Sequence, residues 1–164
     1  MHRFARPCLV ALALAPLAAC SEKDGDDGCT PNSAMEQDTH QLISDYRESI
    51  GLGPLELDAC VSDVARVHSG DMASGAVPFS HDGFEDRAAE VMEMMAGVTT
   101  VGENVAWMTA GYPDPAQTAY EGWLGSPPHL ENIETAAFNL SGMAVVENDA
   151  GELYFTHLLV AVEE

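Results

Sequence analysis

Three short stretches decide how this sequence is interpreted: PFSH at residues 78–81, GEN at residues 102–104 and WLGSPPH at residues 123–129. They bring two imidazoles, His81 and His129, and one carboxylate, Glu103, from three separate places in the chain. Two imidazoles and a carboxylate are side chains that hold a divalent metal with room for water, or that carry out acid and base chemistry. The stretches therefore predict a cleft assembled from distant parts of one small domain.

Helices dominate the sequence around these stretches. Ser33 and Glu36 form a capping box, and apolar residues at helical spacing follow, which predicts a helix over 34–50. Asp58 caps a second predicted helix that ends near residues 74–75. A third helix is predicted over 87–96 and a fourth from the proline-rich turn at 113–115 through Trp123. The third helix is expected to turn four apolar residues toward the core: Ala88, Val91, Met92 and Met95.

Strands gather mainly in the second half of the chain. Residues 101–108, 141–147 and 152–162 have strand composition, and the Asn148–Gly151 segment between the last two predicts a hairpin turn. Helices come first and antiparallel strands later, without the alternation that builds parallel sheets. This order predicts an α+β layered domain.

The three stretches, with GLGPL at residues 51–55 before them and GMAV at 142–145 after them, resemble the bacterial branch of the CAP superfamily. Cysteine-rich secretory proteins, insect venom antigens and plant pathogenesis-related proteins of class 1 share this domain. The resemblance runs from about residue 35 to residue 162. It implies a three-layer α-β-α sandwich with a small antiparallel sheet, and we expect residues 33–164 to form this CAP (SCP) domain.

Family cleft residues are carried over position by position. His81 and Glu103 match the family's first His and its Gly-Glu-Asn carboxylate, and the bacterial members place a His where this chain has His129. These three residues are the expected metal ligands, for Zn²⁺ or Mg²⁺. The eukaryotic second Glu is replaced by Ser126, and the eukaryotic second His falls near Tyr154. The expected cleft comprises His81, Glu103, His129, Asn104, Ser126 and His157.

Three other polar residues are not assigned to the cleft. Glu121 lies on the wrong side of its predicted helix to supply the missing acid. His68 lies on the apolar face of the second helix and is predicted to be structural, whereas His40 is predicted at the surface. A purely structural role for His81, Glu103 and Asn104 stays open, because buried polar groups must be paired.

The N-terminus reads as an export signal over residues 1–19, with Arg3 and Arg6 before an apolar stretch too short to span a bilayer. It ends in LAAC at residues 17–20, which resembles a lipobox with Cys20 as the lipidated residue. We expect residues 20–32 to be a lipidated acidic tether that anchors the domain in the bacterial cell envelope. Ser21 favours the outer membrane or cell surface. An ordinary cleaved signal is the alternative.

Cysteine usage agrees with export. Cys8 leaves with the signal and Cys20 takes lipid, so Cys29 and Cys60 remain and are predicted to form a disulfide in an oxidising compartment. Two free thiols are the alternative. The bond would tie the start of the domain to the second helix.

Charge restricts the possible partners. The chain of 164 residues has a formal net charge of −21, which excludes binding to nucleic acid. The acidic run at residues 24–28 lacks the spacing of a calcium loop.

Three function classes follow from the sequence. We favour a non-enzymatic module that binds a metal ion, lipid or protein at the cleft. A hydrolase, metal-assisted or using Ser80 with His81 and Glu103, is the first alternative, although the sequence holds no Gly-x-Ser-x-Gly and no His-Glu-x-x-His motif. A structural or adhesion protein of the envelope is the second.

Overall fold

The computed structural model describes residues 28–163, so the predicted signal, the predicted lipidation site at Cys20 and most of the predicted acidic tether lie outside the described residues. Nine helices and strands follow one another within this range: α1 (Ala34–Ser49), β1 (Glu56–Leu57), α2 (Ala59–Ser74), α3 (Phe84–Met94), β2 (Val98–Met108), α4 (Pro115–Leu124), α5 (Pro127–Glu134), β3 (Leu140–Glu147) and β4 (Leu153–Val162). None of the helices in residues 28–163 has the length and apolar character needed to cross a bilayer.

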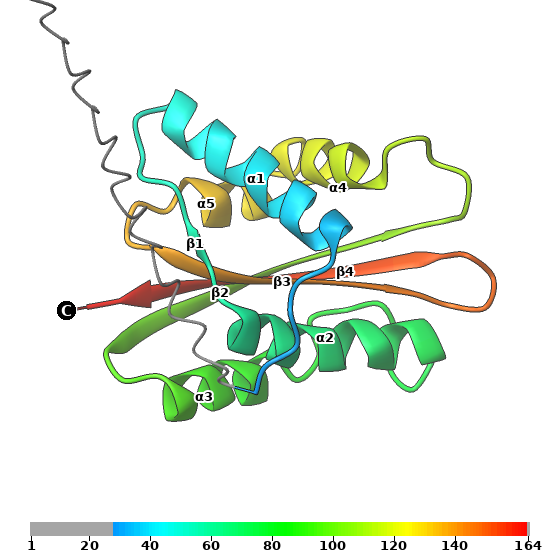
Figure 1. The fold of residues 1–164 in the computed structure, drawn as a ribbon, viewed down its shortest axis with the longest axis horizontal. Coiled ribbons are helices and arrows are strands. Elements are labelled where there is room, and N and C mark those ends of the chain that lie inside the picture. The colour runs from blue at the N-terminus through cyan, green and yellow to red at the C-terminus, as the bar shows by residue number, and fades with distance from the viewer. Residues whose placement is uncertain (1–27, 164) are drawn as a thin grey trace, which may run out of the picture.

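A four-stranded sheet with the order β1-β3-β4-β2 forms the middle layer. Strands β2, β4 and β3 pair antiparallel, whereas the two-residue β1 pairs parallel with β3. Helices α1, α4 and α5 cover one face of the sheet, and α2 and α3 cover the other (Figure 1). The α+β three-layer prediction is confirmed, with the correction that the short β1 makes the sheet mixed rather than purely antiparallel.

Local capping signals fix the first two helices. Ser33 and Glu36 form the predicted capping box at the start of α1. The Asp58 side chain accepts a hydrogen bond from the Val61 amide at the start of α2. The third helix begins earlier than predicted, at Phe84, because Gly83 turns the chain in a left-handed conformation (φ 76°) directly before it.

The sequence predicts no element over the residues of helix α5, which begins with two consecutive prolines. Pro127 opens the helix after Ser126, and Pro128 follows at its second position. Amides in the first turn of a helix have no partner within the helix, so prolines are tolerated there. The helix sets the backbone direction of His129, which follows both prolines.

Two apolar cores lie on opposite faces of the sheet. The core under α1, α4 and α5 contains Ile43, Trp123 and Phe155, all at most 1% exposed. The core under α2 and α3 contains Val61, Val91 and Leu158, all at 0%. The inward prediction for Met92 is wrong: it is 45% exposed, because Ala88 and Val91 define the buried stripe of α3.

Helix α2 approaches the sheet very closely. A Cβ atom built on Gly142 of β3 would collide with the backbone of Val61 and Ser62 in α2. Cys29 and Cys60 form the predicted disulfide, with their Cα atoms 5.1 Å apart, and tie the start of the described chain to the first turn of α2.

Arg47 of α1 is 1% exposed although it carries a charge. Its guanidinium donates hydrogen bonds at 2.7–3.0 Å to four carbonyl oxygens, those of Gly53, Ile133, Thr135 and Phe138. Burial lowers the pKa of Arg47. The side chain therefore holds the end of α5 and the chain before β3 against α1.

Candidate functional site

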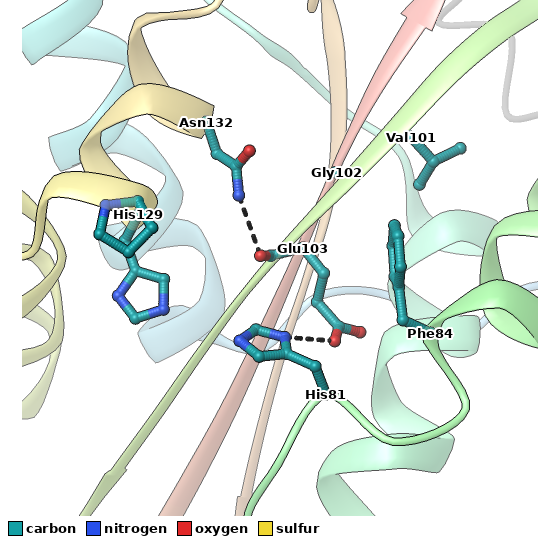
Figure 2. A pocket seen from close by; sticks show the side chains of 8 residues that line it. His81, Phe84, Val101, Gly102, Glu103, His129 and Asn132 are labelled. Atoms are coloured by element: carbon teal, nitrogen blue, oxygen red, sulfur yellow. Dashed lines mark hydrogen bonds and ion pairs between the residues drawn. The ribbon is translucent and has the colours of Figure 1, made fainter.

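A pocket of about 480 Å³ opens beside the edge strand β2. Its walls come from the loop after α2, from α3, from β2 and from α5 (Figure 2). Eight residues line it: His81, Phe84, Val101, Gly102, Glu103, Pro128, His129 and Asn132. The structure thus brings the three predicted metal ligands, His81, Glu103 and His129, to one pocket.

Glu103 is the most constrained of these residues. Its carboxylate accepts two hydrogen bonds from Arg87, Nε to Oε2 at 2.7 Å and Nη2 to Oε1 at 2.8 Å. His81 Nδ1 lies 2.8 Å from the same Oε1. The Glu103 side chain is only 2% exposed, so its carboxylate is largely shielded from water. Paired charges with a fork geometry are among the stronger hydrogen bonds in proteins.

The contact with Glu103 sets the chemistry of His81. An ionised carboxylate can only accept hydrogen bonds, so Nδ1 of His81 carries the hydrogen. Nε2 of a neutral imidazole is then left with a free lone pair. Figure 2 shows this second nitrogen directed away from Glu103, on the side where His129 lies. The His81 side chain is 49% exposed, so the lone pair is accessible from solvent.

Arg87 belongs to no motif, and the sequence predicts only that it lies in a helix. The neighbouring Glu85 and Asp86 suggest an ordinary solvent-facing charged turn. One signal was available: the chain has only six Lys and Arg residues against 27 Asp and Glu, so each cation is a candidate partner for a buried acid. Nothing local indicates that the acid lies sixteen residues further along, at Glu103.

His129 is positioned through its backbone. Asn104 Nδ2 donates to the His129 carbonyl at 3.1 Å, and Asn132 Nδ2 donates to Asn104 Oδ1 at 2.9 Å and to the Glu103 carbonyl at 3.0 Å. Asn104 is 0% exposed and does not line the pocket; it supports the residue that does. Burial, and then the charge of His81, lower the pKa of His129, which favours the neutral, metal-binding form.

The two imidazoles lie at a separation compatible with one shared ion. Their ring centroids are 6.1 Å apart. Two imidazoles on one tetrahedral Zn²⁺ with Zn–N bonds near 2 Å have centroids about 5 Å apart, so a small side-chain movement would suffice. Among residues 28–163, no three His, Cys, Asp or Glu side chains form a group able to hold one ion.

Two predicted serines lie outside the pocket lining. The Ser80 hydroxyl donates to the Pro78 carbonyl at 3.3 Å and accepts from the Asp82 amide at 3.1 Å, so it closes its own turn. Ser126 occupies the position before α5 and makes no side-chain cap bond there. Glu121 is exposed and accepts a hydrogen bond from Gln117 on the surface of α4.

His157 also lies away from the pocket. It pairs in register with Asn104 across β2 and β4, on the face covered by α1, α4 and α5, and it is 0% exposed. Its ring stacks on Trp123 at 5.7 Å and 28°. Neither ring nitrogen has a hydrogen-bond partner among the described residues. Burial, with the nearby charges of His40 and Arg47, lowers the pKa of His157 to about 3.

The other two histidines within residues 28–163 are buried. His68 has the structural role predicted for it: its Nε2 donates to the Ser80 carbonyl at 3.0 Å, next to the residue that enters the pocket. The surface prediction for His40 is wrong. It is 9% exposed and bonded to Ser141 Oγ at 3.1 Å, because it lies on the inward stripe of α1 with Ile43 and Arg47.

Comparison with known proteins agrees with this architecture. The Bacillus subtilis (strain 168) protein YkwD is 30% identical over 134 residues, which cover 79% of this chain; the chain spans about half (50%) of that relative's length. An extracellular SCP-domain protein from Bacillus anthracis str. Ames is 26% identical with a TM-score of 0.59, over 80% of this chain and 44% of that one.

An outer surface protein from Borrelia burgdorferi shares the fold with a TM-score of 0.66 at 15% identity, over 82% of this chain and 98% of that one. The profile of the cysteine-rich secretory protein (CAP) family matches residues 40–160, which include every residue that lines the pocket. The chain therefore belongs to the cysteine-rich secretory protein (CAP) family.

Proposed function

We propose that this chain is a non-enzymatic binding module of the cell exterior that takes a divalent cation, Zn²⁺ in particular, between His81 and His129. One observation carries the proposal. Glu103 holds Nδ1 of His81, which leaves Nε2 free on the pocket side, 6.1 Å centroid to centroid from a second imidazole. A carboxylate behind a histidine is the usual way in which proteins orient a metal-binding imidazole.

Several features support placement outside the cytoplasm. The Cys29–Cys60 disulfide is typical of an oxidising compartment. The signal predicted over residues 1–19 and the lipidated Cys20 would attach the domain to the cell envelope. Two structural relatives carry the descriptions "outer surface protein" and "extracellular protein". We therefore propose an exported, lipid-anchored protein on the outer membrane or cell surface.

Apolar walls beside the imidazoles extend the ligand chemistry. Phe84, Val101 and Pro128 line the pocket together with the two histidines. A lipid or protein ligand could pack an apolar group against these walls while a polar group meets the ion. The imidazole pair is the more specific feature of the pocket, so the cation is the primary ligand of this proposal.

A serine-type hydrolase has no support in the pocket. The eight lining residues include no Ser, Thr or Cys, and the Ser80 hydroxyl closes a turn. Acyl transfer of that type needs a hydroxyl or thiol within reach of its base. Metal-assisted hydrolysis is the remaining alternative. It would be favoured over simple binding if the protein turned over ester or peptide substrates and this turnover stopped both with chelator and in His81→Ala.

Zinc titration by calorimetry tests the proposal. The mature protein should bind Zn²⁺, and His81→Ala and His129→Ala should each weaken binding by more than about tenfold, the cost of losing a metal-site contact. Because a chain of net charge −21 attracts cations in general, Glu121→Gln serves as the control for surface binding. Equal zinc affinity in the wild type and both histidine variants would refute the site.

A further inference from the structure

We propose that Arg87 determines which cations the pocket accepts. By holding both oxygens of Glu103 it keeps this carboxylate out of the ligand set, so that only imidazole nitrogens face an incoming ion. The pocket would then prefer ions that favour nitrogen, such as Zn²⁺, over ions that favour oxygen, such as Mn²⁺ and Mg²⁺. The inference rests on the proposed cation site and adds a positioning residue to it.

Arg87 is held rigidly for this task. Its side chain is 11% exposed, and Nη1 donates to the Asp82 carbonyl at 2.9 Å while Nε and Nη2 bind Glu103. Gly83 gives the guanidinium room, since a Cβ atom there would lie 3.2 Å from Nη1. Arg87 therefore connects β2 to the residue directly after His81, and the position of Glu103 relative to His81 follows from this connection.

The hydrogen bonds at Glu103 leave little capacity for an ion. Oε1 accepts from both His81 Nδ1 and Arg87 Nη2, and Oε2 accepts from Arg87 Nε. A carboxylate offers about four lone-pair positions, of which three are thus occupied. A divalent ion at the last one would also meet the guanidinium charge only a few ångströms away, and like charges repel strongly where water is excluded. Glu103 acts on the ion only through His81.

A merely structural salt bridge makes a different prediction. If Arg87 served only to hold α3 against β2, its loss would lower the stability of the fold and weaken the binding of all cations by the same factor. If it excludes the carboxylate from the ligand set, its loss would free Glu103 and change the ratio of zinc to manganese affinity. The ratio is therefore the decisive quantity, because it is unaffected by a uniform loss of folded protein.

The experiment measures Zn²⁺ and Mn²⁺ binding to the wild type, Arg87→Gln, Arg87→Lys and Glu103→Gln, with unfolding curves for each. In Arg87→Gln we expect Mn²⁺ affinity to rise and the Zn²⁺/Mn²⁺ affinity ratio to fall about tenfold or more. Arg87→Lys keeps the charge without the bidentate hydrogen bonding, so its Zn²⁺/Mn²⁺ affinity ratio should lie between those of Arg87→Gln and the wild type. An unchanged ratio in folded Arg87→Gln overturns the inference.

Glu103→Gln keeps the test decisive if Arg87→Gln does not fold. The amide oxygen can still accept from His81 Nδ1, so Zn²⁺ affinity should fall by less than in His81→Ala. A fall as large as that of His81→Ala means that Glu103 is itself a ligand, which overturns the inference while leaving the cation site in place. A wild type that binds no Zn²⁺ refutes the proposed function itself.

Discussion

Replacement of His157 by leucine is expected to stabilise the fold at neutral pH and to reduce its sensitivity to acid. The His157 ring is fully buried on β4, and neither ring nitrogen has a partner among the described residues. An unpaired buried polar atom costs about 1–3 kcal/mol, whereas leucine has a similar volume and no polar atom. We expect His157→Leu to raise the free energy of unfolding by about 1–2 kcal/mol at pH 7.

The pH dependence follows from the pKa of His157, which burial lowers from 6.5 to about 3. Between these values the unfolded chain carries a proton on His157 that the folded chain lacks, so acid favours unfolding. Stability should therefore fall by about 1.4 kcal/mol per pH unit below pH 6.5, or about 3 kcal/mol between pH 7 and pH 4. His157→Leu removes this contribution, so its advantage over the wild type should grow by that amount.

Urea unfolding followed by circular dichroism at pH 7, 6, 5 and 4 measures the difference. The two proteins share every other ionisable group, so subtracting the two curves leaves the contribution of His157, including its interaction with His40. Phe155→Leu is the matched control, because Phe155 is also 0% exposed, lies two residues away on β4 and contacts Trp123 without titrating. Its loss of stability should be the same at every pH. Parallel curves for the wild type and His157→Leu would show that His157 is not a neutral buried group.

Two further stability predictions test the packing. Gly142→Ala should prevent folding or lower the free energy of unfolding by more than about 3 kcal/mol, since its Cβ meets the backbone of α2. The control is Gly70→Ala, which lies in open space on α2 and should stabilise the protein by up to about 1 kcal/mol in thermal unfolding. Arg47→Lys should lower the free energy of unfolding by about 3 kcal/mol although the charge is kept, because one ammonium cannot reach four carbonyls. A loss of stability in Arg47→Met no larger than the loss in Arg47→Lys would agree with this argument. An Arg47→Lys protein as stable as the wild type would contradict it.

Features fixed by neighbouring residues could be predicted from the sequence. The capping box at Ser33 and the cap at Asp58 need only the next three residues, and both are present. The hairpin turn between β3 and β4 is equally local: Asn148 Oδ1 accepts from the Ala150 and Glu152 amides, and Gly151 adopts a left-handed φ of 76°. Each of these follows from side-chain chemistry over a short span.

Features fixed by distant residues could not be predicted in this way. Strand β1 is two residues long and exists only because it pairs with residues 140–141, more than eighty positions later. Helix α5 opens with two prolines that suggest a loop unless the position of the helix start is already known. The burial of His40 depends on its hydroxyl partner Ser141, which lies on β3.

The site also combines residues that local motifs predict with residues whose position depends on distant parts of the chain. Sequence motifs identify His81 and Glu103, and the structure places the two side chains in contact. Their controlling partner Arg87 carries no motif, since its role depends on α3 folding over β2. His157 fits the strand pattern of a cleft residue, but alternation along a strand does not reveal which face is open. Here that face is covered by Trp123.

The edge strand explains why the pocket lies where it does. On its free side, β2 presents the carbonyls of Glu103 and Val105, which accept from Asn132 Nδ2 and Trp123 Nε1 at 3.0 Å each. An unprotected edge invites pairing with another chain, and these bonds satisfy two carbonyls of this edge within the domain. The Asn132 that closes the edge also holds Asn104, and Asn104 holds the backbone of His129.

Edge protection and site construction therefore use the same side chains, and this limits how function can be separated from stability. Truncating Asn104 or Glu103 to alanine removes buried partners and disturbs both at once, since the Glu103 side chain is 2% exposed and Asn104 is 0% exposed. His81 differs, because its side chain is 49% exposed and is hydrogen-bonded to a carboxylate that Arg87 also holds. A loss of cation binding in His81→Ala without a change in unfolding free energy is thus the cleanest separation of the pocket's chemistry from its scaffold.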